Sequence, residues 1–173
     1  MGGGTTLRCR PVAQPRLHSQ SKGDHDRAIQ YFEKVHELNA QDNFAVAQLA
    51  KLYFQKKKGR ECLAYCNELL RREYEPILAV TLKARVVNFM GGYEAALIFL
   101  QPYLDHNPEN GALWTTLAEI HEYNDEYGSA IKALERAKLL EESEGGKHSQ
   151  DNLQILDAKL KHLRAMPGAP PLT

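Results

Sequence analysis

Cys62 and Cys66 are the first candidates for chemistry in this sequence, because they stand four residues apart. On a helix the two thiols would share one face, as half of a zinc site requires. A structural zinc takes four ligands, and the sequence offers no second pair at a matching spacing. We therefore favour the alternative interpretation, in which both are small side chains buried in a helical packing position.

Catalytic and cofactor motifs are also lacking. The seven histidines form no ligand-spaced cluster, and Gly91-Gly92 lies in a predicted turn rather than after a strand. The sequence has no phosphate loop, no nucleophile elbow and no H-E-x-x-H pattern. We expect a protein that is not an enzyme and that has no catalytic, cofactor-binding or metal-ligating residues.

A basic run, Lys56-Lys57-Lys58 followed by Arg60, is the one local signal for RNA or membrane contact. It also fits a solvated turn, which we favour because Lys plus Arg and Asp plus Glu both total 22. A neutral chain does not favour a nucleic-acid partner. No apolar run approaches the roughly 20 residues of a membrane span. RNA contact through the turn 56–60, within a ribonucleoprotein or organellar complex, remains the alternative function.

The composition indicates one globular chain of 173 residues, 43% hydrophobic and 25% charged, with too few cysteines for a disulfide scaffold. Charge is uneven, because residues 1–23 carry +4 and the remainder therefore −4. Residues 1–22 are predicted to be irregular. This segment is a native N-terminus, a transit peptide, or a splice or gene-model variant. Pro11 and Pro15 would break the helix that a transit peptide needs. We expect a cytoplasmic protein, or an organellar one if the segment is a transit peptide.

These candidate residues are positioned by a repeat with a period of about 34 residues, which runs without insertion or deletion through residues 24–144. One series of small residues is Ala28, Cys62, Ala96 and Ala130, and a second is Ala50, Ala84 and Ala118. Each unit is predicted to be a pair of helices, as at 112–124 and 127–141 in the last unit. Antiparallel helices approach closely only where side chains are small, so the second series is expected to face the first.

The pattern resembles the tetratricopeptide repeat (TPR) family. The last unit matches its motif most fully, through Trp114, Leu117, Ala118, His121, Ala130, Leu134 and Ala137. The resemblance implies an all-α, right-handed superhelical solenoid of antiparallel helical hairpins, with the first helix of each pair on the inner wall. It also implies non-catalytic protein binding, as a scaffold or a subunit in the assembly of a complex.

We predict three full repeats with a helix on either side. The expected divisions are an irregular basic segment (1–22), a half repeat (23–42), full repeats (43–76, 77–110, 111–144), a capping helix (147–166) and a Pro-rich tail (167–173). The half repeat lacks its first helix, because Pro15 and Arg16 occupy positions that should be small or apolar. Another subunit, a second copy, or the N-terminal segment itself is expected to cover it.

The inner wall is the predicted partner-binding groove, because one face of each first helix is free of packing within its own unit. The candidate residues are Phe44, Ala47, Lys51, Phe54, Leu78, Arg85, Asn88, Glu119 and Glu122. Apolar side chains would anchor an extended or helical peptide, while Lys51 and Arg85 would meet its acidic part. For Phe44 and Leu78, packing between adjacent repeats is an equal alternative.

Chaperone tails are not the expected peptide. Members of the family that bind C-terminal peptides of Hsp70 and Hsp90 use a Lys/Asn/Arg carboxylate clamp. The corresponding positions here are Ala47, Lys51, Leu82, Ala112 and Thr116, which retain one polar contact of that clamp.

Overall fold

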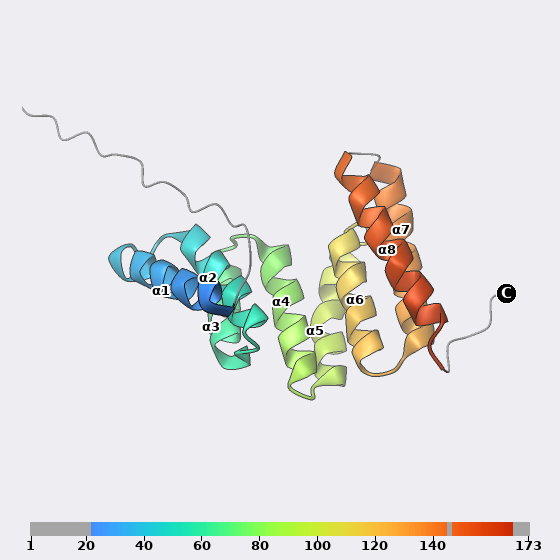
Figure 1. Cartoon of the computed structure of the whole chain (residues 1–173), viewed down its shortest axis with the longest axis horizontal. Helices are drawn as coiled ribbons and strands as arrows, with labels where there is room; N and C mark the ends of the chain where they lie inside the picture. The colour runs from blue at the N-terminus through green and yellow to red at the C-terminus, as the bar shows by residue number, and fades with distance from the viewer. Residues whose placement is uncertain (1–21, 145–146, 168–173) are drawn as a thin grey trace, which may run out of the picture.

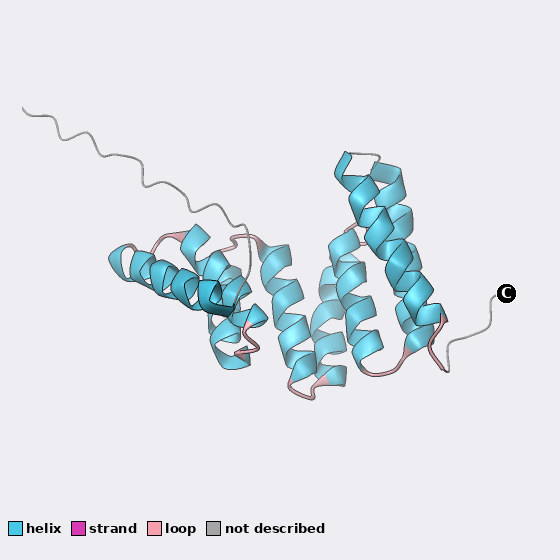
Figure 2. Cartoon of the chain, in the orientation of Figure 1, coloured by secondary structure: helices cyan, strands magenta, loops and turns pink. Residues whose placement is uncertain are grey.

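The computed structural model describes residues 22–144 and 147–167, and these residues form helices without any strand (Figure 2). The helices are α1 (Lys22–Leu38), α2 (Asn43–Gln55), α3 (Gly59–Arg71), α4 (Pro76–Phe89), α5 (Tyr93–His106), α6 (Gly111–Tyr123), α7 (Tyr127–Glu144) and α8 (Lys147–Arg164). None of these described helices has the combination of length and apolar character that crossing a bilayer requires. The prediction of an all-α fold is confirmed.

The helices stack in chain order, each packed on the next, so the chain forms a solenoid (Figure 1). The first helices of successive pairs also pack together, α2 on α4 and α4 on α6. Within the described part of the chain, α3, α5 and α7 form no comparable contacts with one another. The row α2, α4 and α6 is therefore the more crowded, inner side of a curved stack.

Small residues set the spacing within each helix pair, as the repeat predicted. The Sγ of Cys62 lies 3.4 Å from the carbonyl oxygen of Ala50, so α3 approaches the backbone of α2 directly. In the next pair Ala84 and Ala96 belong to one buried cluster, and both are inaccessible to solvent. A larger side chain at these positions would force the helices apart.

The turns inside the three pairs share one backbone geometry at equivalent positions of the repeat. Lys57, Gly91 and Asp125 have φ of 57°, 89° and 61°, which is the left-handed region. In each turn the following N–H donates to a carbonyl five residues back, to Tyr53, Val87 and His121 at 3.0, 3.1 and 2.9 Å. This is the Schellman arrangement that satisfies the last carbonyls of a helix. It ends α2, α4 and α6 at equivalent residues.

The first helix, α1, has no preceding partner among the described residues, and its packing face shows the consequence. Phe32 is half-buried, whereas Cys66 and Leu100, its equivalents in the next units, are completely buried. The predictions for residues 1–21, for the Gly145-Gly146 break and for residues 168–173 lie outside the described residues.

The last helix, α8, closes the far end of the stack. Leu156, Leu160 and Leu163 are buried against α7. Polar contacts border this seam, because Lys138 pairs with Asp157 at 2.7 Å. The helix thus has the apolar inner face and polar outer residues that terminal repeats need.

Candidate protein-binding groove

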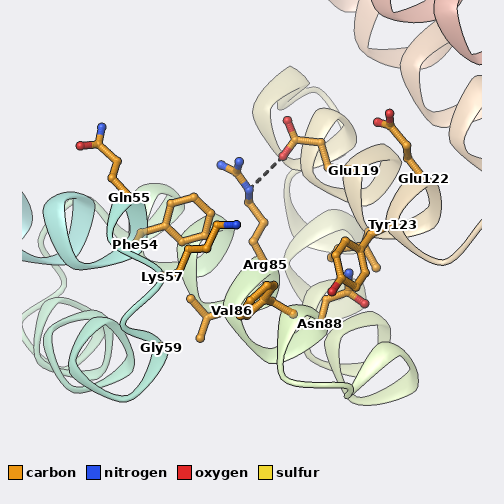
Figure 3. Close-up of a pocket in the computed structure, with 12 residues that line it drawn as sticks. Phe54, Gln55, Lys57, Gly59, Arg85, Val86, Asn88, Glu119, Glu122 and Tyr123 are labelled. Atoms are coloured by element: carbon orange, nitrogen blue, oxygen red, sulfur yellow. Dashed lines mark ion pairs between the residues drawn. The ribbon is translucent and has the colours of Figure 1, made fainter. Parts of the chain in front are cut away.

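A cavity of about 510 Å³ opens on the inner side of the stack, where α2, α4 and α6 end (Figure 3). Its lining residues are Phe54, Gln55, Lys57, Gly59, Arg85, Val86, Asn88, Phe89, Glu119, Ile120, Glu122 and Tyr123. The volume lies in the range of roughly 300–1,000 Å³ that is typical of ligand clefts. The repeat builds this cavity, because each inner helix contributes the same last turn.

The floor of the cavity is apolar. Val86 and Ile120 are buried residues one repeat apart on α4 and α6. The side chains of Phe89 and Tyr123 are also one repeat apart, and their ring centroids lie 6.2 Å from each other. These rings remain 49% and 58% exposed, so about half of two large side chains is left uncovered within the described structure.

A row of charges crosses the groove above this floor. The guanidinium of Arg85 lies 4.5 Å from the ring centroid of Phe54, and its Nε lies 2.9 Å from Oε2 of Glu119 (Figure 3). The other oxygen of Glu119 accepts a hydrogen bond from Nζ of Lys159 at 2.7 Å. Residues of α2, α4, α6 and α8 are thereby connected.

Five of the nine candidate binding residues come together in this cavity: Phe54, Arg85, Asn88, Glu119 and Glu122. Asn88 is buried and accepts a hydrogen bond from Nδ2 of Asn124 at 2.8 Å, so its amide is fixed in the wall. In the sequence-based hypothesis Arg85 meets the acidic part of the partner, whereas in the structure it pairs with Glu119.

The other four candidates lie elsewhere. Ala47 is only 1% exposed and presents no surface, because its small side chain lies in the first core cluster. Leu78 is half-buried against the same cluster, as expected for packing between repeats. Phe44 is 55% exposed and contacts Phe32 edge-on, and Lys51 is half-buried outside the cavity.

The groove residues predicted from the sequence did not include Lys57, which was named only with the basic turn. They also did not include Phe89 and Tyr123, although the period contained a signal for these two. Gln55, Phe89 and Tyr123 are each separated by one full repeat and follow directly after the candidate positions 54, 88 and 122. Helical rotation by one residue moves a side chain about 100° around the axis. Gln55, Phe89 and Tyr123 nevertheless line the cavity, because each is the last residue of its helix and the cavity opens where these helices end.

The basic turn is partly neutralised within the chain. Lys56 pairs with Asp26, and Lys58 lies 4.0 Å from Glu61 and over the ring of Tyr53. Lys57 instead lines the cavity. Local pairing lowers the density of free positive charge that phosphate contacts need, so the structure adds no support for RNA binding.

Three residues that could serve metal or acid–base chemistry are packed in the core or between repeats, namely Cys62, Cys66 and His121. Cys62 and Cys66 are buried free thiols with their sulfur atoms 3.8 Å apart, and within residues 22–144 and 147–167 no group of three or more potential ligands surrounds a common point. Hydrogen bonding to Cys66 and burial raise the pKa of Cys62. His121 shares a hydrogen bond of 2.9 Å with the hydroxyl of Tyr93, and burial lowers its pKa.

The chain is thus a helical-repeat protein of the class that presents a concave wall. Residues 20–86 match the tetratricopeptide repeat family model. Solved structures share the fold, including two of MamA, namely MamA 41-end from Desulfovibrio magneticus RS-1 and the MamA RS-1 ArsTM double mutant. Each is 14% identical with a TM-score of 0.55, and the match covers 82% of this chain and 81% or 80% of the MamA chains, respectively.

A third similar structure is TTC0263, a thermophilic TPR protein of Thermus thermophilus. It is 20% identical with a TM-score of 0.57, over 82% of this chain and 84% of the other. No curated protein matches the sequence. Residues 20–86 thus resemble tetratricopeptide repeats, and the described chain has the TPR-like all-α fold, as the sequence resemblance implied.

Proposed function

We propose that this protein binds a segment of a partner polypeptide in its concave groove, with Phe54, Arg85, Asn88, Glu119 and Glu122 in the contact. The exposed apolar surface at Phe89 and Tyr123 carries this proposal. Such surface is costly to leave in water, and its position in a hollow of about 510 Å³ suits a side chain of another molecule. Phe44, Lys51 and Leu78 would extend the contact toward α1, whereas Ala47 would act only through packing.

A rigid wall favours this role energetically. The groove side chains lie on packed helices, two of which have side-chain N-caps, so little backbone ordering accompanies binding. Asp42 caps α2 by accepting from the N–H of Ala45 at 2.9 Å, and Asn110 caps α6 by accepting from Leu113 at 3.2 Å. Binding energy would then concentrate in a few apolar anchors.

Site-specific photo-crosslinking tests the proposal. A benzophenone amino acid is placed at Gln55 in the cavity or, as the matched control, at Ile98, which is 73% exposed on α5. Proteins captured by the full-length chain from cells are expected to crosslink through position 55 and not through position 98. Crosslinking at 55 should also fall in the Phe89→Ser/Tyr123→Ser variant. Equal crosslinking at both positions, or none at 55, would contradict groove binding.

A further inference from the structure

The groove contains two charges that the chain itself does not neutralise, and they lie on opposite sides of the apolar floor. Lys57 follows α2 at one side of the cavity, and Glu122 lies on α6 at the other (Figure 3). Neither has an ion-pair partner among the residues of 22–144 and 147–167. Both belong to the cavity lining, so a ligand in the cavity would lie near them.

The remaining charges of the groove are already compensated. The carboxylate of Glu119 receives Arg85 on one oxygen and Lys159 on the other, at 2.9 and 2.7 Å. The guanidinium of Arg85 also lies over Phe54. A partner charge at either residue would share it with the opposite charge already paired there, whereas Lys57 and Glu122 have no ion-pair partner among the described residues. The groove charges that have no ion-pair partner among the described residues are therefore one cation and one anion, separated by an apolar hollow.

We propose that the cavity takes one large apolar side chain of a partner segment that carries an acidic residue on one side of this anchor and a basic residue on the other. The acidic residue would lie toward Lys57 and the basic residue toward Glu122. This inference rests on the proposed function of the groove, and it specifies the chemistry of the ligand. It replaces the hypothesis that Arg85 meets the acidic part of the partner.

The apolar cavity and the two rim charges would make different contributions to the binding of the partner segment. Burial of an aromatic or aliphatic anchor against Val86, Phe89 and Tyr123 would supply most of the affinity, because apolar burial in a desolvated pocket dominates such contacts. The two rim charges are solvated, so each would add a smaller term that acts mainly on selectivity. Segments with two like charges would place one of them beside a like charge of the rim.

The probes are three pools of short fluorescent peptides with a central Phe, Trp or Leu. The flanks are acid and base in the first pool, two acids in the second and two bases in the third. Fluorescence anisotropy with the full-length chain is expected to show tightest binding to the mixed-charge pool. Because the comparison concerns the kinds of flanking charge, it is independent of the direction in which a peptide lies.

Charge reversal gives the decisive variants. Lys57→Glu leaves two acidic groups at the rim and should shift the preference to the two-base pool. Glu122→Lys should shift it to the two-acid pool. The controls Lys132→Glu and Glu94→Lys, at exposed sites outside the cavity, make the same changes in net charge and should keep the mixed-charge preference.

The anchor is tested by Tyr123→Ser and by Gln55→Trp, which fills the mouth of the cavity from an exposed position. Each should weaken the mixed-charge peptides about tenfold, with melting temperatures checked in parallel. Peptides that bind the groove without charge preference, or with a preference unchanged by reversal, would overturn this inference and leave groove binding intact. If no pool binds, or if binding ignores both anchor variants, the cavity is not an anchor site. Failure of the crosslinking experiment would overturn the proposed function itself.

Discussion

The guanidinium Nε of Arg85 lies 2.9 Å from the carboxylate of Glu119, in the equivalent position one repeat later. The same carboxylate also binds Lys159 of α8. Arg85 and Glu119 lie on the helix face that is not used for packing within a repeat. Their ion pair therefore connects two neighbouring repeats. It ties α4, α6 and the closing helix together on the inner side of the stack.

Removing the charge of Glu119 should weaken the attachment of α8 to the inner helices. We expect Glu119→Gln to lower the free energy of unfolding by about 0.5–1 kcal/mol, because the pairs are partly exposed and screened by solvent. The loss should shrink at high salt. Chemical denaturation measures it, and Glu122→Gln, which has no ion pair among the described residues, is the control. A double-mutant cycle with Lys159→Met that gives no coupling would contradict this role.

Enlarging a small packing residue should be more costly. Ala84 is fully buried in one cluster with Ala96 and Leu100, so Ala84→Leu places extra volume where two helices touch. We expect a loss of about 1–3 kcal/mol in the free energy of unfolding. The exposed substitution Lys132→Gln should leave stability nearly unchanged. Tolerance of leucine at 84 would mean that α4 and α5 are not in close contact there.

The turn after α4 predicts a graded effect of glycine replacement. Gly91 has φ of 89°, and no atom lies within 4 Å of a Cβ added there, so the cost is confined to the backbone. Gly91→Ala should destabilise the fold by about 1 kcal/mol. Gly91→Asn should cost less, since asparagine enters the left-handed region more readily. Equal melting temperatures for all three proteins would contradict this turn geometry.

The pH dependence of stability should include a contribution from His121. Burial lowers the pKa of its imidazole below the ordinary value of 6.5, and a smaller contribution from Glu126 opposes the shift. The unfolded chain therefore binds a proton more readily, so stability is lost as the pH falls through this region. Denaturation between about pH 7.5 and 5.5 should show a weaker loss for His121→Phe, which keeps the ring but cannot titrate. An identical slope in both proteins would show that His121 does not contribute.

The sequence was sufficient to predict the helix pairs and the contacts inside them. The regular spacing of Ala50 and Cys62, and of Ala84 and Ala96, identifies the facing positions, because helical periodicity fixes which side chains share a face. Helical periodicity also placed Arg85 and Glu119 on one face of their helices, and the family resemblance implied that this face belongs to the inner wall. It could not predict their pairing, since the period fixes an orientation around each helix and not the distance between neighbouring helices.

What the sequence by itself determined is the repeat and the all-helical fold, while the inner row of helices was implied by the family resemblance. Only the tertiary structure decided that Ala47 is buried, that Phe89 and Tyr123 lie side by side in the lining of a cavity, and that Lys57 and Glu122 are left without ion-pair partners among the described residues. The physical reason is that exposure and charge pairing depend on how closely and at what angle successive repeats pack. Many side chains together determine that packing, and the length of the repeat does not specify it.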